Sequence, residues 1–224
     1  MNPRPACLAL VLLLAACGSG TPAGAPAEDS GANTANIAEA RAPEPLPDTV
    51  RVRLETDDGA IVLALDAKHA PITAANFVRY VDAHRFDGTS FYRAARTTGA
   101  PKHGFIQGGI RREYRRMFPP IAHEPTSKTG LKHVAGTISM ARSDTPGVGA
   151  MGDFFILVSA MPSLNATADD PGYAAFGQVV EGMDVVRTIL AAETVPNAGR
   201  GAMRGEMIAK PVKIISASRV PEPN

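Results

Sequence analysis

Alternating apolar and polar residues predict a β-hairpin at the start of the longest foldable stretch of this chain. In VRVRLETDDGAIVLALD, apolar side chains occupy every second position over 50–54 and again over 61–65. A period of two is typical of strands with one buried face, and the Asp57-Asp58-Gly59 triplet between the runs has the composition of a tight turn. The two runs are therefore expected to pair as antiparallel strands.

The rest of the pattern predicts a mainly β fold with two helices. Five further β-prone runs follow along the chain: FIQGG, GTISMA, DFFILVS, AAFGQVV and KPVKIISASRV. One helix is expected to begin near Pro71 with Thr73 as its cap, and a second carries Met183, Val186 and Leu190 on one face. Many short strands with two isolated helices favour a closed antiparallel barrel capped by those helices.

The first seventeen residues predict a signal that directs the chain out of the cytoplasm. MNPRPACLALVLLLAAC has one positive charge, an apolar run and small residues before a cysteine, which indicates a cleaved signal peptide over 1–16. Its last four residues resemble the bacterial lipobox, in which the cysteine, here Cys17, carries lipid; an ordinary signal peptide is the alternative. Bacterial lipoproteins with Asp after that cysteine tend to stay in the inner membrane. Gly18 therefore favours the outer membrane, facing the periplasm.

Composition divides the remaining chain into a tether, a domain and a short tail. Residues 17–47 are rich in Ala, Gly and Pro with almost no large apolar side chains, so we expect a lipidated cysteine followed by a disordered tether. Residues 48–220 are long enough to bury one sizeable core. Residues 221–224 form a C-terminal tail.

Charge and cysteine usage narrow the chemistry that is open to this domain. The chain has 23 basic and 22 acidic residues, so no excess charge points to nucleic acid as a partner. Of its two cysteines, Cys7 would leave with the signal peptide and Cys17 would be acylated. No thiol would then remain for a disulfide, a metal or nucleophilic catalysis. The five histidines show no ligand spacing, so we expect no metal and no other cofactor.

Five blocks of sequence together form a specific family pattern. Each block alone is a weak indication, but their order along the chain makes the combination specific. They are APITAANFVRYVDAHRFDGTSFYR, GFIQGG, LKHVAGTISMAR, GDFFILVS and AAFGQVVEGMDVV, and they span nearly all of 49–220. In this order they resemble the cyclophilin-type peptidyl-prolyl isomerases. The resemblance implies a closed eight-stranded antiparallel barrel with a helix over each end. It also implies an enzyme that accelerates cis/trans isomerisation of X-Pro bonds in extracytoplasmic proteins as they fold.

Arg93 is the residue that the resemblance implies for catalysis. Rotation about an X-Pro bond must break amide resonance, over a barrier of ~18–20 kcal/mol. A guanidinium is permanently charged and presents several N–H donors in a fixed fork, which suits it to stabilise the twisted state. Gln107 would hold the substrate backbone through its amide, and the glycines after it permit close approach of another backbone.

The resemblance also implies residues that contact the proline and its neighbours. Phe155 corresponds to the aromatic floor of the proline pocket, Leu164 to an apolar residue lining that pocket, and Ala141 to a backbone contact with the substrate. Tyr173 falls near the pocket histidine, where its ring can stack and its hydroxyl can donate. Ser163 falls where cyclosporin-binding relatives have tryptophan, so we expect weak cyclosporin binding.

One departure from the family leaves an alternative open. Family members have the arginine and the glutamine close together, whereas RAARTTGAPKHGFIQ inserts several residues between Arg93 and Gln107. The family's Gly-Phe-Met-x-Gln block is also one residue short. Either Phe105 stands at the methionine position, with Gly104 at the position of the pocket phenylalanine, or Phe105 supplies the ring itself.

A binding module is the alternative function. It would be a proline-recognising or holdase lipoprotein that has the same fold and little or no turnover. In both cases the expected partners are unfolded or proline-containing polypeptides, and we expect a monomer. A basic run of four arginines follows QGG and is either a solvated loop or a surface for acidic clients or anionic lipid; it comprises Arg111, Arg112, Arg115 and Arg116.

Overall fold

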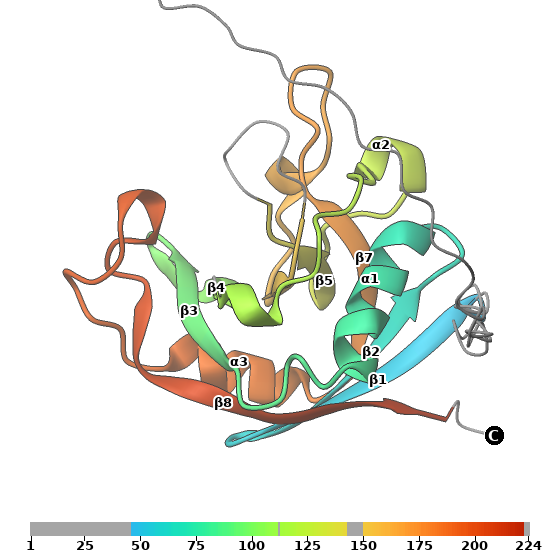
Figure 1. Cartoon of the computed structure of the whole chain (residues 1–224). Coiled ribbons are helices and arrows are strands. Elements are labelled where there is room, and N and C mark those ends of the chain that lie inside the picture. The colour runs from blue at the N-terminus through green and yellow to red at the C-terminus, as the bar shows by residue number, and fades with distance from the viewer. Residues whose placement is uncertain (1–45, 112, 143–149, 222–224) are drawn as a thin grey trace, which may run out of the picture. The chain divides into compact units, whose positions relative to one another are not determined.

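A closed antiparallel barrel forms the centre of the structure, a computed structural model that describes residues 46–111, 113–142 and 150–221 (Figure 1). The strand order around the barrel is β1-β2-β7-β5-β6-β4-β3-β8. The eight strands are β1 (Thr49–Thr56), β2 (Gly59–Asp66), β3 (Ser90–Thr97), β4 (Ala100–Gly109), β5 (Thr137–Met140), β6 (Asp153–Leu157), β7 (Ala174–Glu181) and β8 (Met207–Val220). The barrel predicted from the sequence is confirmed. The predicted signal peptide, Cys17, the tether up to residue 45 and residues 222–224 lie outside the described residues.

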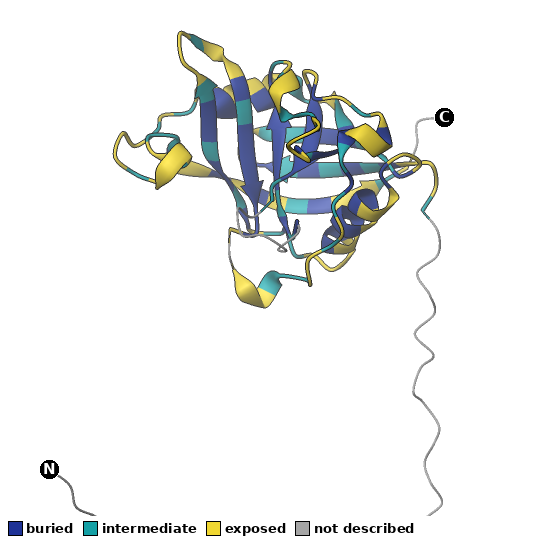
Figure 2. Ribbon diagram, turned by 90° about the horizontal axis from the view of Figure 1, so that it is seen from above, coloured by how far each residue is buried: buried dark blue, intermediate teal, exposed yellow. Residues whose placement is uncertain are grey.

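The β1–β2 hairpin forms as the alternating pattern predicts. Thr56 pairs with Gly59 at the turn, and the Thr56 hydroxyl donates to the Gly59 carbonyl oxygen at 2.7 Å. Gly59 has a φ of 128°, which a side chain at this position would strain. The apolar residues at every second position, Val50, Val52, Leu54, Ile61, Leu63 and Leu65, are buried in the core. Their neighbours in β1 are more exposed, whereas in β2 Val62 is buried as well, and Figure 2 shows buried and less buried residues along the strands.

Three α-helices accompany the barrel: α1 (Pro71–Asp82), α2 (Thr126–Thr129) and α3 (Met183–Ala191). The two helices that the sequence predicts, α1 and α3, are confirmed, and their apolar faces join the core. The four-residue helix α2 was not predicted, because TSKT has no apolar periodicity to indicate it. No helix in 46–111, 113–142 or 150–221 is long and apolar enough to cross a membrane.

The predicted cap of α1 is wrong. The capping position is Ala70, and Thr73 lies inside the first turn with its side chain buried. Glu124 takes the capping role from a loop 51 residues away, accepting the N–H groups of Ile72 and Thr73 at 3.1 and 2.6 Å. A carboxylate at a helix N-terminus satisfies free N–H groups and favours the dipole. No local sequence pattern signals such a long-range cap.

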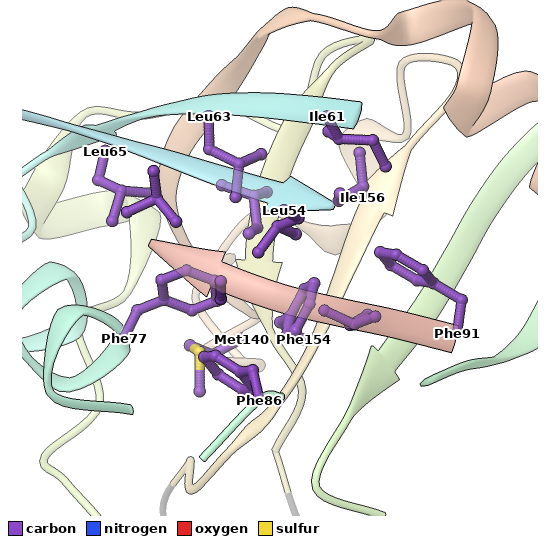
Figure 3. Packing of buried hydrophobic residues seen from close by; sticks show 14 of the residues in the cluster. Leu54, Ile61, Leu63, Leu65, Phe77, Phe86, Phe91, Met140, Phe154 and Ile156 are labelled. Atoms are coloured by element: carbon purple, nitrogen blue, oxygen red, sulfur yellow. The ribbon is translucent and has the colours of Figure 1, made fainter. Parts of the chain in front are cut away.

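Aromatic side chains fill much of the barrel interior (Figure 3). The ring centroid of Phe77 in α1 lies 4.9 Å from that of Phe86, 5.2 Å from Phe154 and 5.4 Å from Phe176. All four side chains are fully buried. Edge-to-face and tilted aromatic pairs add stabilisation beyond their buried area. This cluster therefore attaches α1 to strands β6 and β7.

The β3–β4 hairpin contains the inserted residues between Arg93 and Gln107. β3 and β4 are joined by a turn at Thr98 and Gly99. Their pairing has two register irregularities, one between Phe91 and Arg93 and one between Arg96 and Thr97, just before the turn. The residues between Arg93 and Gln107 all lie in this hairpin, so they do not separate Arg93 from its cross-strand partner. Arg93 and Gln107 stand directly opposite each other although they are fourteen positions apart in sequence.

Candidate active site

Arg93 and Gln107 meet on the β3–β4 hairpin. The Arg93 Nη1 donates to the Gln107 side-chain oxygen Oε1 at 2.8 Å. The Arg93 side chain is 15% exposed, and Gln107 is buried. Because its oxygen is used by Arg93, the Gln107 amide presents its NH2 group as the remaining donor. Arg93 and Gln107, which the sequence predicts as the catalytic and a substrate-binding residue, thus form one hydrogen-bonded pair.

Phe105 supplies an aromatic ring beside Arg93. The Phe105 ring centroid lies 5.0 Å from the Arg93 guanidinium carbon and 5.1 Å from the Phe155 centroid. Gly104 has a φ of 131°, and a Cβ there would lie 1.9 Å from the Ala95 carbonyl oxygen. No side chain fits at position 104, and the aromatic ring that contacts Arg93 is that of Phe105.

Phe155 is the centre of an aromatic group on β6. Its ring packs on Phe105 and meets Tyr173 edge-on with centroids 5.3 Å apart. Its neighbour Phe154 points the opposite way, into the core, because successive side chains on a strand alternate between faces. We call the group of Arg93, Phe105, Gln107, Phe155 and Tyr173 the Arg93 cluster.

Leu164 and Ala141 lie close to the Arg93 cluster along the backbone. Leu164 ends a short 3-10 helix (Pro162–Leu164) and is half-buried, and its carbonyl oxygen accepts the Tyr173 N–H at 3.0 Å. Ala141 directly follows β5, and its N–H donates to the Asp153 carbonyl oxygen at 2.9 Å. Ser163 is exposed. These positions are next to the cluster, and their contacts with a substrate stay predictions.

Two of the arginines, Arg142 and Arg116, are engaged in contacts within the protein. Arg142, directly after Ala141, lies 5.2 Å from the Tyr173 ring centroid and pairs with Asp170 at 2.9 Å. Arg116 of the basic run pairs with Glu113 at 2.8 Å and donates to the carbonyl oxygens of Arg85 and Asp87. Arg112 lies outside the described residues. The run is thus partly structural.

His133 lies behind the Phe155 ring and was not assigned to the site from the sequence, although it stands in the LKHVAGTISMAR block. Its ring is nearly parallel to that of Phe155, with centroids 6.2 Å apart. Asn165 Oδ1 accepts both the His133 N–H at 3.0 Å and, at 2.8 Å, its ring Nδ1, so Nδ1 carries the proton. Nε2 is then free to accept the Ser139 hydroxyl at 3.0 Å. Burial lowers the pKa of His133, and the Asn165 hydrogen bond only partly offsets this effect.

We predict that His133 makes the fold less stable in mild acid. Its pKa is lower in the folded than in the unfolded chain, so below about pH 6.5 the unfolded chain binds the proton first. The free energy of unfolding should therefore fall as pH drops below this value, by at most about 1.4 kcal/mol per pH unit, until the folded-state pKa is passed. Urea unfolding at about pH 7.5 and 5.5 should show a smaller loss for His133→Gln than for the parent. An equal loss in both proteins would contradict the assignment.

Burial also affects Tyr92, which directly precedes Arg93 at a register irregularity in the β3–β4 pairing. Desolvation raises the pKa of the Tyr92 hydroxyl, and the neighbouring Asp153 carboxylate raises it further. Tyr92 therefore has a neutral hydroxyl group at physiological pH.

In the described residues, no group of three or more His, Cys, Asp or Glu side chains is placed to hold a metal ion.

Glu206 is the residue at the Arg93 cluster that the sequence did not indicate. Its Oε2 accepts the Arg93 Nε–H at 2.7 Å and lies 2.7 Å from Nη2. It stands in GRGAMRGEM, a segment with no recognisable motif. Nothing in its spacing from Arg93 could have identified it, because the contact joins residues 113 positions apart.

The arrangement offers charged N–H donors beside aromatic surface. Arg93 supplies the donors, Gln107 a further amide, and Phe105, Phe155 and Tyr173 a group of contacting aromatic rings. Such donors act strongly where water is partly excluded. The cluster can therefore hold an apolar ring and stabilise a displaced carbonyl oxygen or amide nitrogen beside it.

Sequence comparison places this barrel among known proteins. Residues 51–219 match the family described as "Cyclophilin type peptidyl-prolyl cis-trans isomerase/CLD". A peptidyl-prolyl cis-trans isomerase of Acinetobacter baylyi is 38% identical over 168 residues, which cover 74% of this chain and 82% of the relative. Peptidyl-prolyl cis-trans isomerase B of Escherichia coli is 32% identical over 170 residues, or 75% of this chain and 98% of the relative.

Solved structures agree on the fold. A cyclophilin-type peptidyl-prolyl cis-trans isomerase of Cryptosporidium parvum, crystallised in the presence of the dipeptide Ala-Pro, superposes with a TM-score of 0.58 at 20% sequence identity. The superposition covers 77% of this chain and 99% of the other. At this identity the likeness shows the fold alone. With the family match over nearly the whole barrel, it leads to one conclusion: the chain belongs to the cyclophilin-type peptidyl-prolyl cis-trans isomerases.

Proposed function

We propose that the Arg93 cluster is the isomerase active site and that Arg93 is its catalytic residue. During rotation about an X-Pro bond, the imide nitrogen becomes pyramidal and the carbonyl oxygen swings out of the amide plane. Interactions that are stronger in this twisted state than in the planar one lower the barrier. The guanidinium provides such interactions through fixed, charged N–H donors.

The aromatic residues are proposed to bind the substrate proline. Phe155 would form the floor beneath the proline ring, with Phe105, Tyr173 and Leu164 around it. The Gln107 NH2 group and the backbone at Ala141 would hold the flanking peptide. A family relative of the same fold was crystallised in the presence of Ala-Pro, which supports a short X-Pro peptide as the first substrate to test.

The observation that carries this proposal is the hydrogen-bonded Arg93–Gln107 pair beside Phe105 and Phe155. It brings together, from strands β3, β4 and β6, the donor, the backbone grip and the apolar surface that isomerisation needs. No nucleophile is required, because no covalent bond is made or broken in the substrate. This fits a domain, residues 48–220, whose sequence contains no cysteine.

Refolding of a model protein with a proline-limited slow phase tests the proposal. Uncatalysed isomerisation takes tens to hundreds of seconds, so the slow phase is easily resolved. We expect the full chain, purified in mild detergent, to shorten this phase at substoichiometric concentration. A holdase would suppress aggregation and leave the slow-phase rate unchanged, and that result would favour the binding-module alternative.

The proposed setting is the bacterial cell envelope. We propose that Cys17 carries lipid after removal of residues 1–16 and that the domain faces the periplasm, held at the outer membrane. The apolar run ending in Leu-Ala-Ala-Cys and the following Gly18 support this. Residues 18–47 would then act as a flexible tether with a reach on the order of 30 Å. The clients of the domain would be envelope proteins, whose X-Pro bonds it would isomerise as they fold.

Replacing Cys17 with Ser tests the anchor. Lipid anchoring depends on the acylated thiol, so Cys17→Ser should move the protein from the membrane fraction to the soluble fraction. Cys7→Ser is the matched control, because Cys7 would leave with the signal peptide, and it should not alter the partition. Membrane association that persists in Cys17→Ser would contradict lipidation.

A further inference from the structure

Glu206 contacts Arg93, the proposed catalytic residue. A single carboxylate oxygen of Glu206 lies 2.7 Å from both Nε and Nη2 of Arg93. The two side chains are 26% and 15% exposed, so the pair is partly shielded from water. Partial burial strengthens such a charge-assisted contact relative to a pair on the open surface.

The backbone fixes Glu206 at this place. It directly precedes β8, and its carbonyl oxygen accepts the N–H of Ala94, the residue after Arg93, at 2.9 Å. Met207, the next residue, is the β8 partner of Arg93 in the β3–β8 pairing. The segment before β8 therefore lies beside β3 (Figure 1), and the carboxylate is held by its own backbone and by strand pairing rather than by a free loop.

The contacts leave Arg93 with donors for a substrate. A guanidinium has five N–H groups: one on Nε and two on each terminal nitrogen. Glu206 uses Nε and lies against Nη2, while Gln107 uses Nη1. At least one N–H on each terminal nitrogen remains. Two partners, one on β4 and one just before β8, thus fix the plane of the guanidinium and leave donors at its end.

We propose that Glu206 is a positioning residue that holds the Arg93 guanidinium in its catalytic orientation. This inference rests on the proposed catalytic role of Arg93. Arginine has a long side chain with about 2 kcal/mol of rotamer entropy, which must be lost before its donors can act in the transition state. Glu206 fixes the orientation before substrate arrives, so that less reorganisation is needed during the reaction.

Glu206 also affects the charge of the site, and this effect opposes the first. A carboxylate 2.7 Å away reduces the positive field that the guanidinium projects toward a substrate oxygen. If this reduction dominated, removal of Glu206 would raise the rate. We expect orientation to dominate, because hydrogen bonds from the remaining N–H groups depend steeply on direction, whereas a guanidinium without its carboxylate is free to turn toward solvent.

The test compares Glu206→Ala and Glu206→Gln in the full chain, with kcat and KM measured on an Ala-Pro peptide. Glu206→Ala should lower kcat by about 10- to 100-fold, the range for a displaced catalytic group, with KM within about twofold. Glu206→Gln keeps an oxygen that accepts the Nε–H, so it should restore kcat to within about threefold of the parent. The matched control is Glu181→Ala, which breaks an ion pair with Arg51 instead and should leave both constants unchanged.

A spectroscopic readout checks the contact without relying on turnover. In a protein labelled with ¹⁵N at arginine, the Arg93 Nε–H should give a protected signal, identified by its loss in Arg93→Lys. The signal should persist in Glu206→Gln and disappear through exchange with water in Glu206→Ala. A signal that is unchanged in Glu206→Ala would show that Glu206 does not fix the guanidinium and would overturn the proposal.

The kinetic outcomes separate this inference from the one on which it rests. If Arg93→Ala is slow and Glu206→Ala has the parent kcat or a higher one, Arg93 is catalytic and the positioning role of Glu206 is refuted. If Arg93→Ala itself keeps the parent rate, the catalytic role of Arg93 fails and the role of Glu206 fails with it. A slow Glu206→Ala rescued by Glu206→Gln supports both.

Discussion

Replacement of Arg93 by Ala should lower kcat/KM for an Ala-Pro peptide by about 10²- to 10³-fold, the cost of removing one preorganised donor of a developing charge. The loss should fall mainly on kcat, because Phe105, Phe155 and Tyr173 would still bind the proline ring. Interactions made only in the twisted state affect turnover rather than binding. A protease-free isomerisation assay over a range of peptide concentrations gives both constants.

Arg93→Lys is the control that separates charge from geometry. Lysine keeps the positive charge but lacks the planar fork that contacts Gln107 and Glu206 together. We therefore expect it to recover only a small part of the lost rate. Circular dichroism and urea unfolding should show that both variants are folded. If a folded Arg93→Ala protein kept the parent kcat, the catalytic assignment would be wrong.

The adjacent pair Phe154 and Phe155 should respond to substitution in opposite ways. Phe154 is fully buried and meets Phe77, Phe86 and Phe91 edge-on. Phe154→Ala should lower the free energy of unfolding by about 3–5 kcal/mol, because it leaves a cavity among rings that are held in place. Differential scanning calorimetry or urea unfolding measures this loss, while the folded fraction should keep its activity.

Phe155→Ala should mainly weaken substrate binding. Its neighbours Phe105 and Tyr173 are half-buried, so the site can relax toward solvent more easily than the core can. Loss of the aromatic floor should raise KM by roughly 10- to 100-fold, as the burial of one large apolar surface is worth about 1.5–3 kcal/mol. If Phe155→Ala had the larger stability loss and Phe154→Ala the larger effect on KM, the assignment of the two faces of β6 would be reversed.

The barrel could be predicted because its strands have a strong local pattern. The run over 50–54 alternates strictly, and Ile61, Leu63 and Leu65 continue the period of two in the second strand; these apolar positions are buried as the pattern requires. The Arg93–Gln107 pair could also be predicted, but only through the order of the sequence blocks. The residues between them obscured the spacing, and in the structure those residues lie within one hairpin that sets Arg93 opposite Gln107.

Other parts of the site depend on tertiary contacts that have no local pattern. Glu124 caps α1 and Glu206 pairs with Arg93 across separations of 51 and 113 residues. A single sequence contains nothing that links such residues. The predicted cap at Thr73 was wrong for the same reason. The buried Glu124 carboxylate, supplied by another loop, binds the free N–H groups of the first turn more strongly than a threonine hydroxyl would. Steric exclusion at Gly104 likewise became visible only in three dimensions.

The central claim is that this chain isomerises X-Pro bonds through Arg93 rather than only binding them. Exchange spectroscopy on a ¹⁵N-labelled Ala-Pro peptide at equilibrium tests it most directly, because binding shifts and cis/trans exchange are read from the same sample. We predict that the parent accelerates exchange and that folded Arg93→Ala still shifts the peptide signals without accelerating exchange. Binding without accelerated exchange in the parent, or equal acceleration by both proteins, would contradict the account.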